Sequence, residues 1–382
     1  MSLEAKAHGI PMGTPWFKLK NYANAHGVIA RSSNYELYGN LSQRVMEIIG
    51  RCAAWQEVYS VDESFIGMKG TVEELRVTGH QIRREVLQET GIPVRVSIGR
   101  TKTLANRGAK ADLSLGGVCH LGAYPAVQVD RILASTDLTD IWGIAGRLSK
   151  RLQNLGIHTA KELRYADVAW IRKKFGVVVA RTVMELAGTP CLDLELVPPA
   201  AKDQLIFSRS FSRKITTPNE MEQVAAIYSQ RVGERLRKQG SVTSLMKVWA
   251  ATGWADEGSP SHSASVSVPL AHPTDHPIEL AQAVKHLLPH LFPPHLPGVR
   301  YARLGVILLD LRPKEAQSML PMFDPGLPAV GAVMDQINQK LGRGSLGVAV
   351  GGLATPPSWE MKREMLSPRA TTHWDELAIA YA

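Results

Sequence analysis

The sequence predicts a multidomain protein of the α+β class, in which helices cover one face of each sheet. A length of 382 residues is enough for two to four domains with cores of their own. Helical and strand-like periodicities alternate along the chain, and a proline-rich stretch at 198–201 separates two such regions. Hydrophobic residues make up 45% of the sequence, an ordinary share for a folded soluble protein.

The first region combines a hairpin with helices and a strand. A helix is predicted over residues 40–54, because Asn40 can cap it and its apolar side chains recur on one face. Gly91 and Pro93 end the next long helical pattern. The expected elements are a helix over 40–54, a hairpin around residue 62, a helix over 73–89, a strand over 94–99 and a short helix over 101–111.

The second region follows a linker over 196–205 and is predicted to be another α+β domain. Met334, Ile337 and Leu341 recur farther on at helical spacing and indicate one amphipathic helix. The other expected elements are a strand over 204–215, a helix over 219–237, strands over 245–251 and 302–311, and a proline-rich loop over 289–297.

Composition narrows the class of protein. Cys52, Cys119 and Cys191 are odd in number and far apart, so neither a disulfide framework nor a zinc site is indicated. No apolar run is long enough to span a bilayer, and the N-terminus has no secretory pattern. The formal net charge is +9, and residues 316–382 contribute none of the excess. The excess positive charge therefore lies in residues 1–315, and the cysteine pattern fits a reducing cytoplasm. Both features suit a polyanionic partner such as nucleic acid.

Asp62 and Glu63 stand side by side between apolar residues in the run from Tyr59 to Gly67. An ionised carboxylate is costly to bury unless a cation or hydrogen-bond donors compensate, and two neighbouring carboxylates repel each other. A divalent metal held for phosphoryl chemistry would offset both costs. The alternative is a polar hairpin turn with both side chains exposed at its tip. The residues alone leave the two interpretations open.

A second candidate site is the run from Leu138 to Arg147. It predicts two helices joined by a tight turn containing Gly143 and Gly146, a helix-hairpin-helix whose amides hold a phosphate oxygen without reading bases. The alternative is an ordinary helical hairpin with a solvated basic face. The basic side chains beside the turn are Arg147, Lys150 and Arg151.

Several motifs, in order along the chain, resemble one known family. The run from Tyr59 to Phe65 resembles the acidic motif of the Y-family translesion DNA polymerases. The match to the UmuC-like branch, which supplies the catalytic subunit of bacterial DNA polymerase V, extends over essentially the whole chain. The other similar segments are Gly9–Gly13, Ser32–Gly39, Thr101–Asn106, Ile141–Ile144, Phe207–Phe211 and Trp359–Pro368.

This resemblance implies a right-hand polymerase fold and an activity. The activity would be error-prone translesion DNA synthesis in the SOS response to DNA damage, with nucleotidyl transfer from a dNTP to a primer 3′-hydroxyl. The implied domains are fingers over 1–34, a palm over 35–123, a helical thumb with the helix-hairpin-helix over 124–195, the linker over 196–205, an α+β little finger over 206–315 and a tail over 316–382.

The resemblance also assigns roles to individual residues. Asp62 and Glu63 would be the palm carboxylates that hold two Mg²⁺ ions, one for the attacking hydroxyl and one for the leaving pyrophosphate. Lys6 and Lys110 would contact the triphosphate of the incoming nucleotide, a task that suits a lysine point charge. The residues expected to contact DNA are Gly143, Gly146, Arg147, Lys150, Arg151, Ser208, Arg209 and Ser210.

The chain departs from the family pattern at three places. A first palm strand with another catalytic aspartate is usual, but Met1 coincides with the early fingers and Asp62 is the earliest aspartate. The palm would therefore be incomplete, with unpaired sheet edges, and we expect little or no polymerase activity from the 382 residues. The helix before Lys110 is also shorter, which shifts that side chain by about 5 Å. Ala145 stands where a glycine is usual in the thumb turn.

The beginning of the tail resembles a peptide that binds a sliding clamp. Leu320, Met322 and Phe323 would fill a hydrophobic pocket of the clamp, and Met319 replaces the expected glutamine, which lowers the expected affinity. A linker packed on its own domain is the alternative. The resemblance further implies damaged primer-template DNA and dNTP as substrates, a UmuD-type accessory subunit and a RecA-type filament as partners, and a cytoplasmic, nucleoid-associated location.

Three alternative interpretations of the sequence remain open. A catalytically impaired DNA-binding remnant of such a polymerase would use only the hairpin and the little finger. A metal-dependent nuclease with a helix-hairpin-helix would need a further acidic or histidine cluster near the N-terminus, which the sequence lacks. A complete polymerase would need an extension upstream of Met1 that encodes an aspartate-containing strand.

Overall fold

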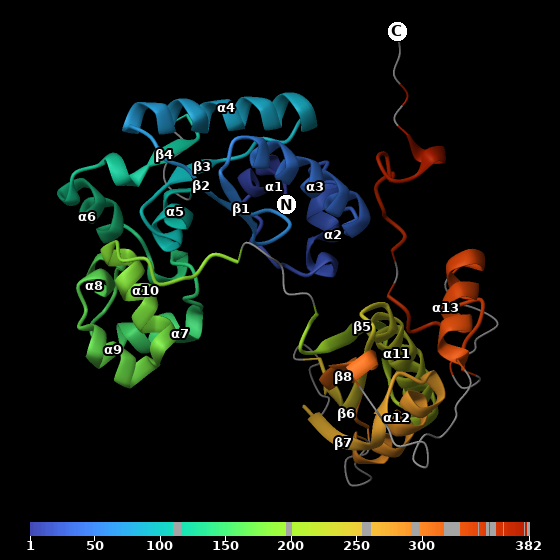
Figure 1. Cartoon of the computed structure of the whole chain (residues 1–382). Coiled ribbons are helices and arrows are strands. Elements are labelled where there is room, and N and C mark those ends of the chain that lie inside the picture. Colours follow the sequence, from blue (N-terminus) through green and yellow to red (C-terminus); the bar gives the residue numbers. More distant parts are fainter. Residues whose placement is uncertain are drawn as a thin grey trace. The chain divides into compact units, whose positions relative to one another are not determined.

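The computed structural model describes residues 1–109, 116–195, 201–253, 261–291, 298–316, 329–342, 344–348, 351, 357–361, 363–377 and 379. They divide into two compact units (Figure 1). The first unit comprises Met1–Pro198 and Met365–Ala382, and the second comprises Pro199–Glu364. Within the described ranges, no helix has both the length and the apolar character that crossing a membrane requires.

The first unit opens with helices α1 (Leu3–Ala7), α2 (Trp16–Ala25) and α3 (Tyr35–Arg51). The sequence predicted that α3 would begin after Asn40, but Asn34 caps it, because the Asn34 side chain accepts a hydrogen bond from the Leu37 amide at 3.3 Å. The amide nitrogen of Asn34 also donates to the carbonyl oxygen of Ser367 at 3.2 Å. This distant contact holds the cap in place, so the helix begins earlier than its apolar pattern indicates.

Short strands and two helices follow in the predicted palm. β1 pairs antiparallel with β2, and β3 pairs parallel with β4. Thr71 and Glu74 form a capping box at the start of α4, and Gly91 ends it in the left-handed conformation with a φ of 71°. These elements are β1 (Trp55–Val58), β2 (Ser64–Gly67), α4 (Val72–Thr90), β3 (Val96–Ile98), α5 (Lys102–Ala109) and β4 (Val118–His120). The core between α3 and α4 contains Val45, Ile48, Ile82 and Val86.

A helical part completes the first unit. Its core extends into the palm, since Leu104 of α5 and Cys119 of β4 pack in the same cluster. The buried carboxylate of Glu185 strengthens this connection by accepting a hydrogen bond from the Thr103 amide at 3.0 Å. The helices are α6 (Ala126–Ala134), α7 (Gly146–Gln153), α8 (Ala160–Arg164), α9 (Val168–Phe175) and α10 (Val177–Ala187). Fully buried side chains include Leu133, Leu152, Leu163, Ile171 and Leu186.

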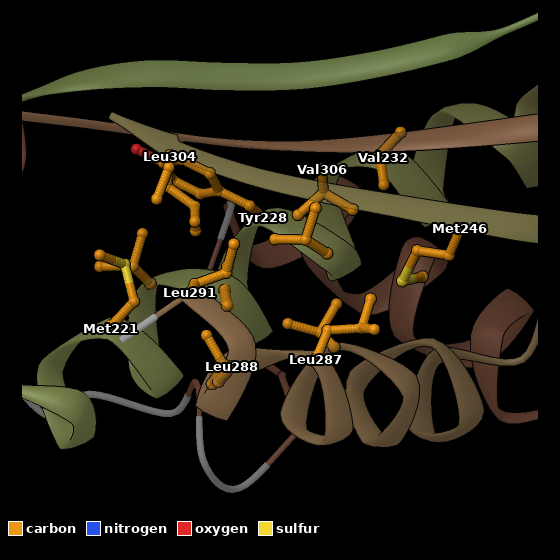
Figure 2. Packing of buried hydrophobic residues seen from close by; sticks show 14 of the residues in the cluster. Met221, Tyr228, Val232, Met246, Leu287, Leu288, Leu291, Leu304 and Val306 are labelled. Carbon is orange, nitrogen blue, oxygen red and sulfur yellow. The ribbon is translucent and has the colours of Figure 1, made fainter. Parts of the chain in front are cut away.

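An antiparallel sheet with the strand order β5-β8-β6-β7 forms the base of the second unit. Figure 2 shows apolar side chains packed between this sheet and two helices. The elements are β5 (Leu205–Ile215), α11 (Pro218–Lys238), β6 (Ser241–Thr252), β7 (Ser263–Thr274), α12 (Pro277–Leu291) and β8 (Tyr301–Pro313). The labelled core residues are Met221, Tyr228 and Val232 of α11, Leu287, Leu288 and Leu291 of α12, Met246 of β6, and Leu304 and Val306 of β8.

The sequence did not predict β7 or α12. β7 contains prolines at positions 269 and 273, and it lies at the edge of the sheet, where a missing amide donor is tolerated. The proline-rich loop was expected from residue 289, yet Pro289 lies inside the last turn of α12. Buried leucines on α12 outweigh the lost hydrogen bond at that position.

The segment predicted as one tail is divided between the two units. In the second unit, α13 (Val330–Leu341) packs on α11, and Asp335 pairs with Arg237 at 2.6 Å. Trp359 is buried among the core residues of the same unit.

The continuation of this segment belongs to the first unit. Leu366 forms a parallel bridge with Ser32, and the Ser32 amide donates to the carbonyl oxygen of Met365 at 2.8 Å. Ser367 accepts the hydrogen bond from Asn34 described above. A little farther on, the Arg369 side chain and amide hold the pKa of Glu376 at about 2. The chain thus leaves the first unit before residue 199 and enters it again at residue 365.

Candidate active site and nucleic-acid surfaces

Asp62 and Glu63 lie in the turn that joins β1 to β2. The strands pair from Trp55 with Gly67 to Val58 with Ser64, so residues 59–63 form the connection. The amides of Tyr59 and Ser60 both donate to the carbonyl oxygen of Glu63 at 3.0 Å. Asp62 is exposed and Glu63 is half-buried. The pair therefore lies at a hairpin tip, and we call residues 59–63 the carboxylate turn.

Neighbouring polar groups orient both carboxylates. The hydroxyl of Ser60 donates to Oδ1 of Asp62 at 2.7 Å, and Nδ2 of Asn106 on α5 donates to Oε1 of Glu63 at 3.1 Å. Asn106 was noted in the sequence only as the end of a motif, and its contact with Glu63 was not predicted. Asp62 is exposed to solvent and Glu63 is partly exposed, so a hard cation such as Mg²⁺ would find carboxylate oxygens as suitable ligands there. The donor set fits that ion.

A buried ion pair lies beneath the carboxylate turn. Nζ of Lys102 is 2.6 Å from Oε2 of Glu57, and the two side chains are only 10% and 6% exposed. Lys102 also donates to the carbonyl oxygen of Asp193 at 2.6 Å, and Glu57 accepts from the Glu195 amide at 3.0 Å. The pair thus ties the hairpin to α5 and to the segment after α10. Sequence analysis did not identify it, because neither residue stands out from the local pattern.

The other predicted nucleotide and clamp contacts are only partly described. Lys6 lies exposed on α1, and among the described residues no hydrogen bond or ion pair joins it to the carboxylate turn. Lys110, Leu320, Met322 and Phe323 lie outside the described residues.

The thumb turn runs from Ile141 to Ala145 and leads into α7. Gly143 has a φ of 84°, a conformation that favours glycine. Ala145 is the N-cap of α7 and makes no side-chain cap hydrogen bond, so the first amides of that helix have no partner within it. Gly143 and Gly146 are exposed. This arrangement leaves a helix N-terminus open to an anion.

The first arm of the predicted helix-hairpin-helix is shorter than expected. It is the single 3₁₀ turn Leu138–Asp140 rather than an α-helix. Asp137 explains the difference, because its carboxylate accepts hydrogen bonds from both the amide and the hydroxyl of Thr139 and so forms a local turn.

The basic residues of the thumb turn are not equivalent. Arg147 and Lys150 are exposed on α7. Arg151 is held against α9, since its guanidinium carbon lies 4.9 Å from the centre of the Phe175 ring and its Nη2 donates to the carbonyl oxygen of Lys174. Arg147 and Lys150 are therefore the better placed residues for a phosphate.

Arg209 on β5 donates a hydrogen bond from Nη1 to the carbonyl oxygen of its predicted neighbour Ser208 at 3.2 Å. The Arg209 guanidinium lies 5.1 Å from the Phe207 ring, and that ring packs against the core beneath the sheet. The hydroxyl of Ser208 accepts a hydrogen bond from Arg303 of β8 at 3.1 Å. Arg303 also lies 5.3 Å from the ring of Trp249 on β6. Sequence analysis missed Arg303 and Trp249, because their proximity to Ser208 depends on the pairing of distant strands.

Three family models match the chain. The impB/mucB/samB family matches residues 1–109, and the impB/mucB/samB family C-terminal domain matches residues 202–320. A domain of unknown function, DUF4113, matches residues 328–380. The first two cover the carboxylate turn and the sheet of the second unit.

Individual relatives agree with these models. Protein UmuC of Salmonella typhimurium strain LT2 is 37% identical, and the match covers 98% of this chain and 90% of the relative. Protein SamB of Salmonella typhimurium is 36% identical, with coverage of 99% and 90%. A solved Y-family DNA polymerase chimera, Dbh-Dpo4(243-245)-Dbh, shares the fold with a TM-score of 0.60 at 20% identity, covering 81% of this chain and 85% of the chimera. The predicted fold class is thereby confirmed, and the chain belongs to the impB/mucB/samB family, the UmuC-like branch of the Y-family polymerases.

Proposed function

We propose that this protein carries out translesion DNA synthesis by transferring nucleotides from dNTP to a primer 3′-hydroxyl. The observation that carries the proposal is the carboxylate turn, with Asp62 exposed and Glu63 oriented by Asn106. The first unit would supply the fingers, palm and thumb, and the second would supply the little finger. A role in the SOS response and pairing with a UmuD-type subunit are further parts of the proposal, supported by the similarity to UmuC.

We assign Mg²⁺ binding to Asp62 and Glu63. Magnesium is usually bound through one or two carboxylates, with water and substrate phosphates completing its shell. When bound, such ions supply activation of the attacking hydroxyl and neutralisation of the charge on the leaving pyrophosphate. The protein's own contribution is to hold the carboxylate oxygens in place through Ser60 and Asn106.

Replacing Asp62 tests the proposal directly. Relative to the extension that the unaltered 382 residues support, which the sequence predicts to be low, we expect Asp62→Asn to reduce magnesium-dependent primer extension by about 10³-fold, because several kcal/mol of charge stabilisation depends on the carboxylate. The measurement is extension of a labelled primer on a damaged template. Asp203→Asn, at an exposed acidic residue outside the turn, serves as the control. Extension at the wild-type rate by Asp62→Asn would show that the turn is not the catalytic centre.

A DNA-binding protein without nucleotidyl transfer is the second candidate. Among the described residues, no group of three or more histidine, cysteine, aspartate or glutamate side chains is placed to hold a metal ion. The carboxylate turn therefore offers fewer protein ligands than a closed metal site. Salt-dependent binding of primer-template DNA without magnesium-dependent extension would favour this candidate.

The thumb turn makes a separate prediction about DNA affinity. Arg147→Ala combined with Lys150→Ala should reduce the slope of log K against log salt concentration by about 2, because each lost phosphate contact contributes about 0.9 on duplex DNA. Fluorescence anisotropy with primer-template DNA over a salt series measures the slope. Arg151→Ala is the matched control and should change it less, because Arg151 is held against Phe175. Equal slopes in the double variant and the wild type would exclude these residues as phosphate contacts.

A further inference from the structure

An aromatic cluster connects the thumb turn to the carboxylate turn. The ring of Trp142 lies 5.0 Å from that of Tyr59 in an edge-to-face arrangement and 5.6 Å from that of Phe65. Tyr59 and Phe65 are themselves 5.9 Å apart. Trp142 directly precedes Gly143 in the thumb turn, whereas Tyr59 and Phe65 flank Asp62 and Glu63. A single indole thus contacts both sides of the carboxylate turn.

This cluster is not part of a buried core. Tyr59 is 47% exposed, and neither it nor Trp142 nor Phe65 belongs to the hydrophobic clusters of the first unit. Trp142 itself is half-buried. Aromatic rings at these separations and angles attract each other through their quadrupoles. Their grouping at the thumb turn and the β1–β2 hairpin, rather than under a helix, indicates a specific connection between those two segments.

Lys102 makes a further contact with the aromatic cluster. Nζ of Lys102 lies 5.5 Å from the centre of the Phe65 ring, and the same atom is held by Glu57. Phe65 therefore contacts both a fixed cation and the Trp142 indole. A shift of Trp142 would be transmitted to the carboxylate turn, because Tyr59 and Phe65, which flank that turn, both contact Trp142 and Phe65 also contacts the fixed Lys102.

We propose that Trp142 is a positioning residue through which phosphate binding at the thumb turn orders the carboxylate turn. This inference rests on the proposed function, since it concerns the same carboxylates. Anion contact with the amides after Gly143 restricts the thumb turn, and Trp142 carries that restriction to Tyr59 and Phe65. Asp62 and Glu63 are then held for the metal when DNA is present. Trp142 touches neither DNA nor nucleotide in this scheme.

Hydrogen exchange of the hairpin amides tests the coupling without relying on activity. In the wild type, primer-template DNA should slow exchange at Tyr59 and Ser60, whose amides donate to Glu63. In Trp142→Ala, DNA affinity should stay within about threefold while the slowing at these amides is lost, a change of about 5- to 150-fold for a typical coupling between sites. Trp142→Phe should keep most of the effect. Trp170→Ala, at a half-buried tryptophan on α9 in the same helical part, should keep all of it.

The outcomes separate this inference from the proposed function. If DNA slows exchange at the hairpin equally in Trp142→Ala and in the wild type, the coupling role of Trp142 is wrong, whatever the polymerase activity. If DNA binds the wild type without any change at the hairpin, the inference also fails, although extension assays can still support the function. Loss of DNA binding in Trp142→Ala, with circular dichroism unchanged, would make Trp142 a binding residue instead.

Discussion

The Trp359→Ala variant is expected to lose about 3–5 kcal/mol of the free energy of unfolding of the second unit, as buried tryptophan truncations do. Trp359 is 5% exposed, and its ring lies 6.2 Å from that of Phe211 and 6.4 Å from that of Tyr228. Its carbonyl oxygen also accepts the amide of Ser212 on the edge strand β5 at 3.0 Å. Removing the indole leaves a cavity against these rings.

Native-state hydrogen exchange at buried β8 amides, such as those of Leu304 and Val306, measures this loss within the second unit. The matched control is Trp374→Ala, because Trp374 is 88% exposed in the same C-terminal segment and should change stability by less than about 0.5 kcal/mol. Similar small changes for both variants would mean that the tail does not stabilise the second unit. The expected difference would make part of the DUF4113 match a structural component of that unit.

Breaking the Glu57–Lys102 pair is expected to cost the first unit about 3–5 kcal/mol, because Glu57→Ala leaves a charged Lys102 buried without its partner. Urea denaturation followed by circular dichroism measures the loss. Arg51→Ala is the control, since the Arg51–Glu89 pair is 58% and 42% exposed and such pairs contribute about 0–1 kcal/mol.

A double variant distinguishes charge from packing in this region. Glu57→Leu combined with Lys102→Met should recover part of the loss, because replacing both partners of a buried pair by apolar groups is often close to neutral. The recovery should be incomplete, since the Asp193 carbonyl and the Glu195 amide also lose a partner. If the double variant is less stable than Glu57→Ala, buried charge is not the cause.

Local signals predicted much of the fold. The capping box at Thr71 and Glu74 and the glycine at position 91 set both ends of α4 close to where the sequence placed them. Strand alternation likewise located β5 and β8. The start of α3 was wrong, because Asn34 caps the helix, and the Asn34 side chain also contacts Ser367, more than three hundred residues away. No local pattern contains that contact.

In the candidate site, too, local features were predictable from the sequence and contacts between distant residues were not. The hairpin around Asp62 and Glu63 was identifiable from adjacent residues, and the structure places both in one turn. The contact between Asn106 and Glu63 requires α5 to pack beside the hairpin, which local periodicity does not specify. Similarly, Arg303 reaches Ser208 only because β8 lies between β5 and β6. Side-chain partners across strands were therefore the least predictable part.

The return of the chain to the first unit at residue 365 has a consequence for synthesis on the ribosome. Residues 1–198 emerge first, but Ser32 and Asn34 acquire their partners Leu366 and Ser367 only after the entire second unit has been translated. At about 5–20 residues per second, translation of the second unit, from residue 199 to residue 364, takes roughly ten to thirty seconds. The second unit therefore has time to fold before the first is complete, and the capping contact at Asn34 closes last.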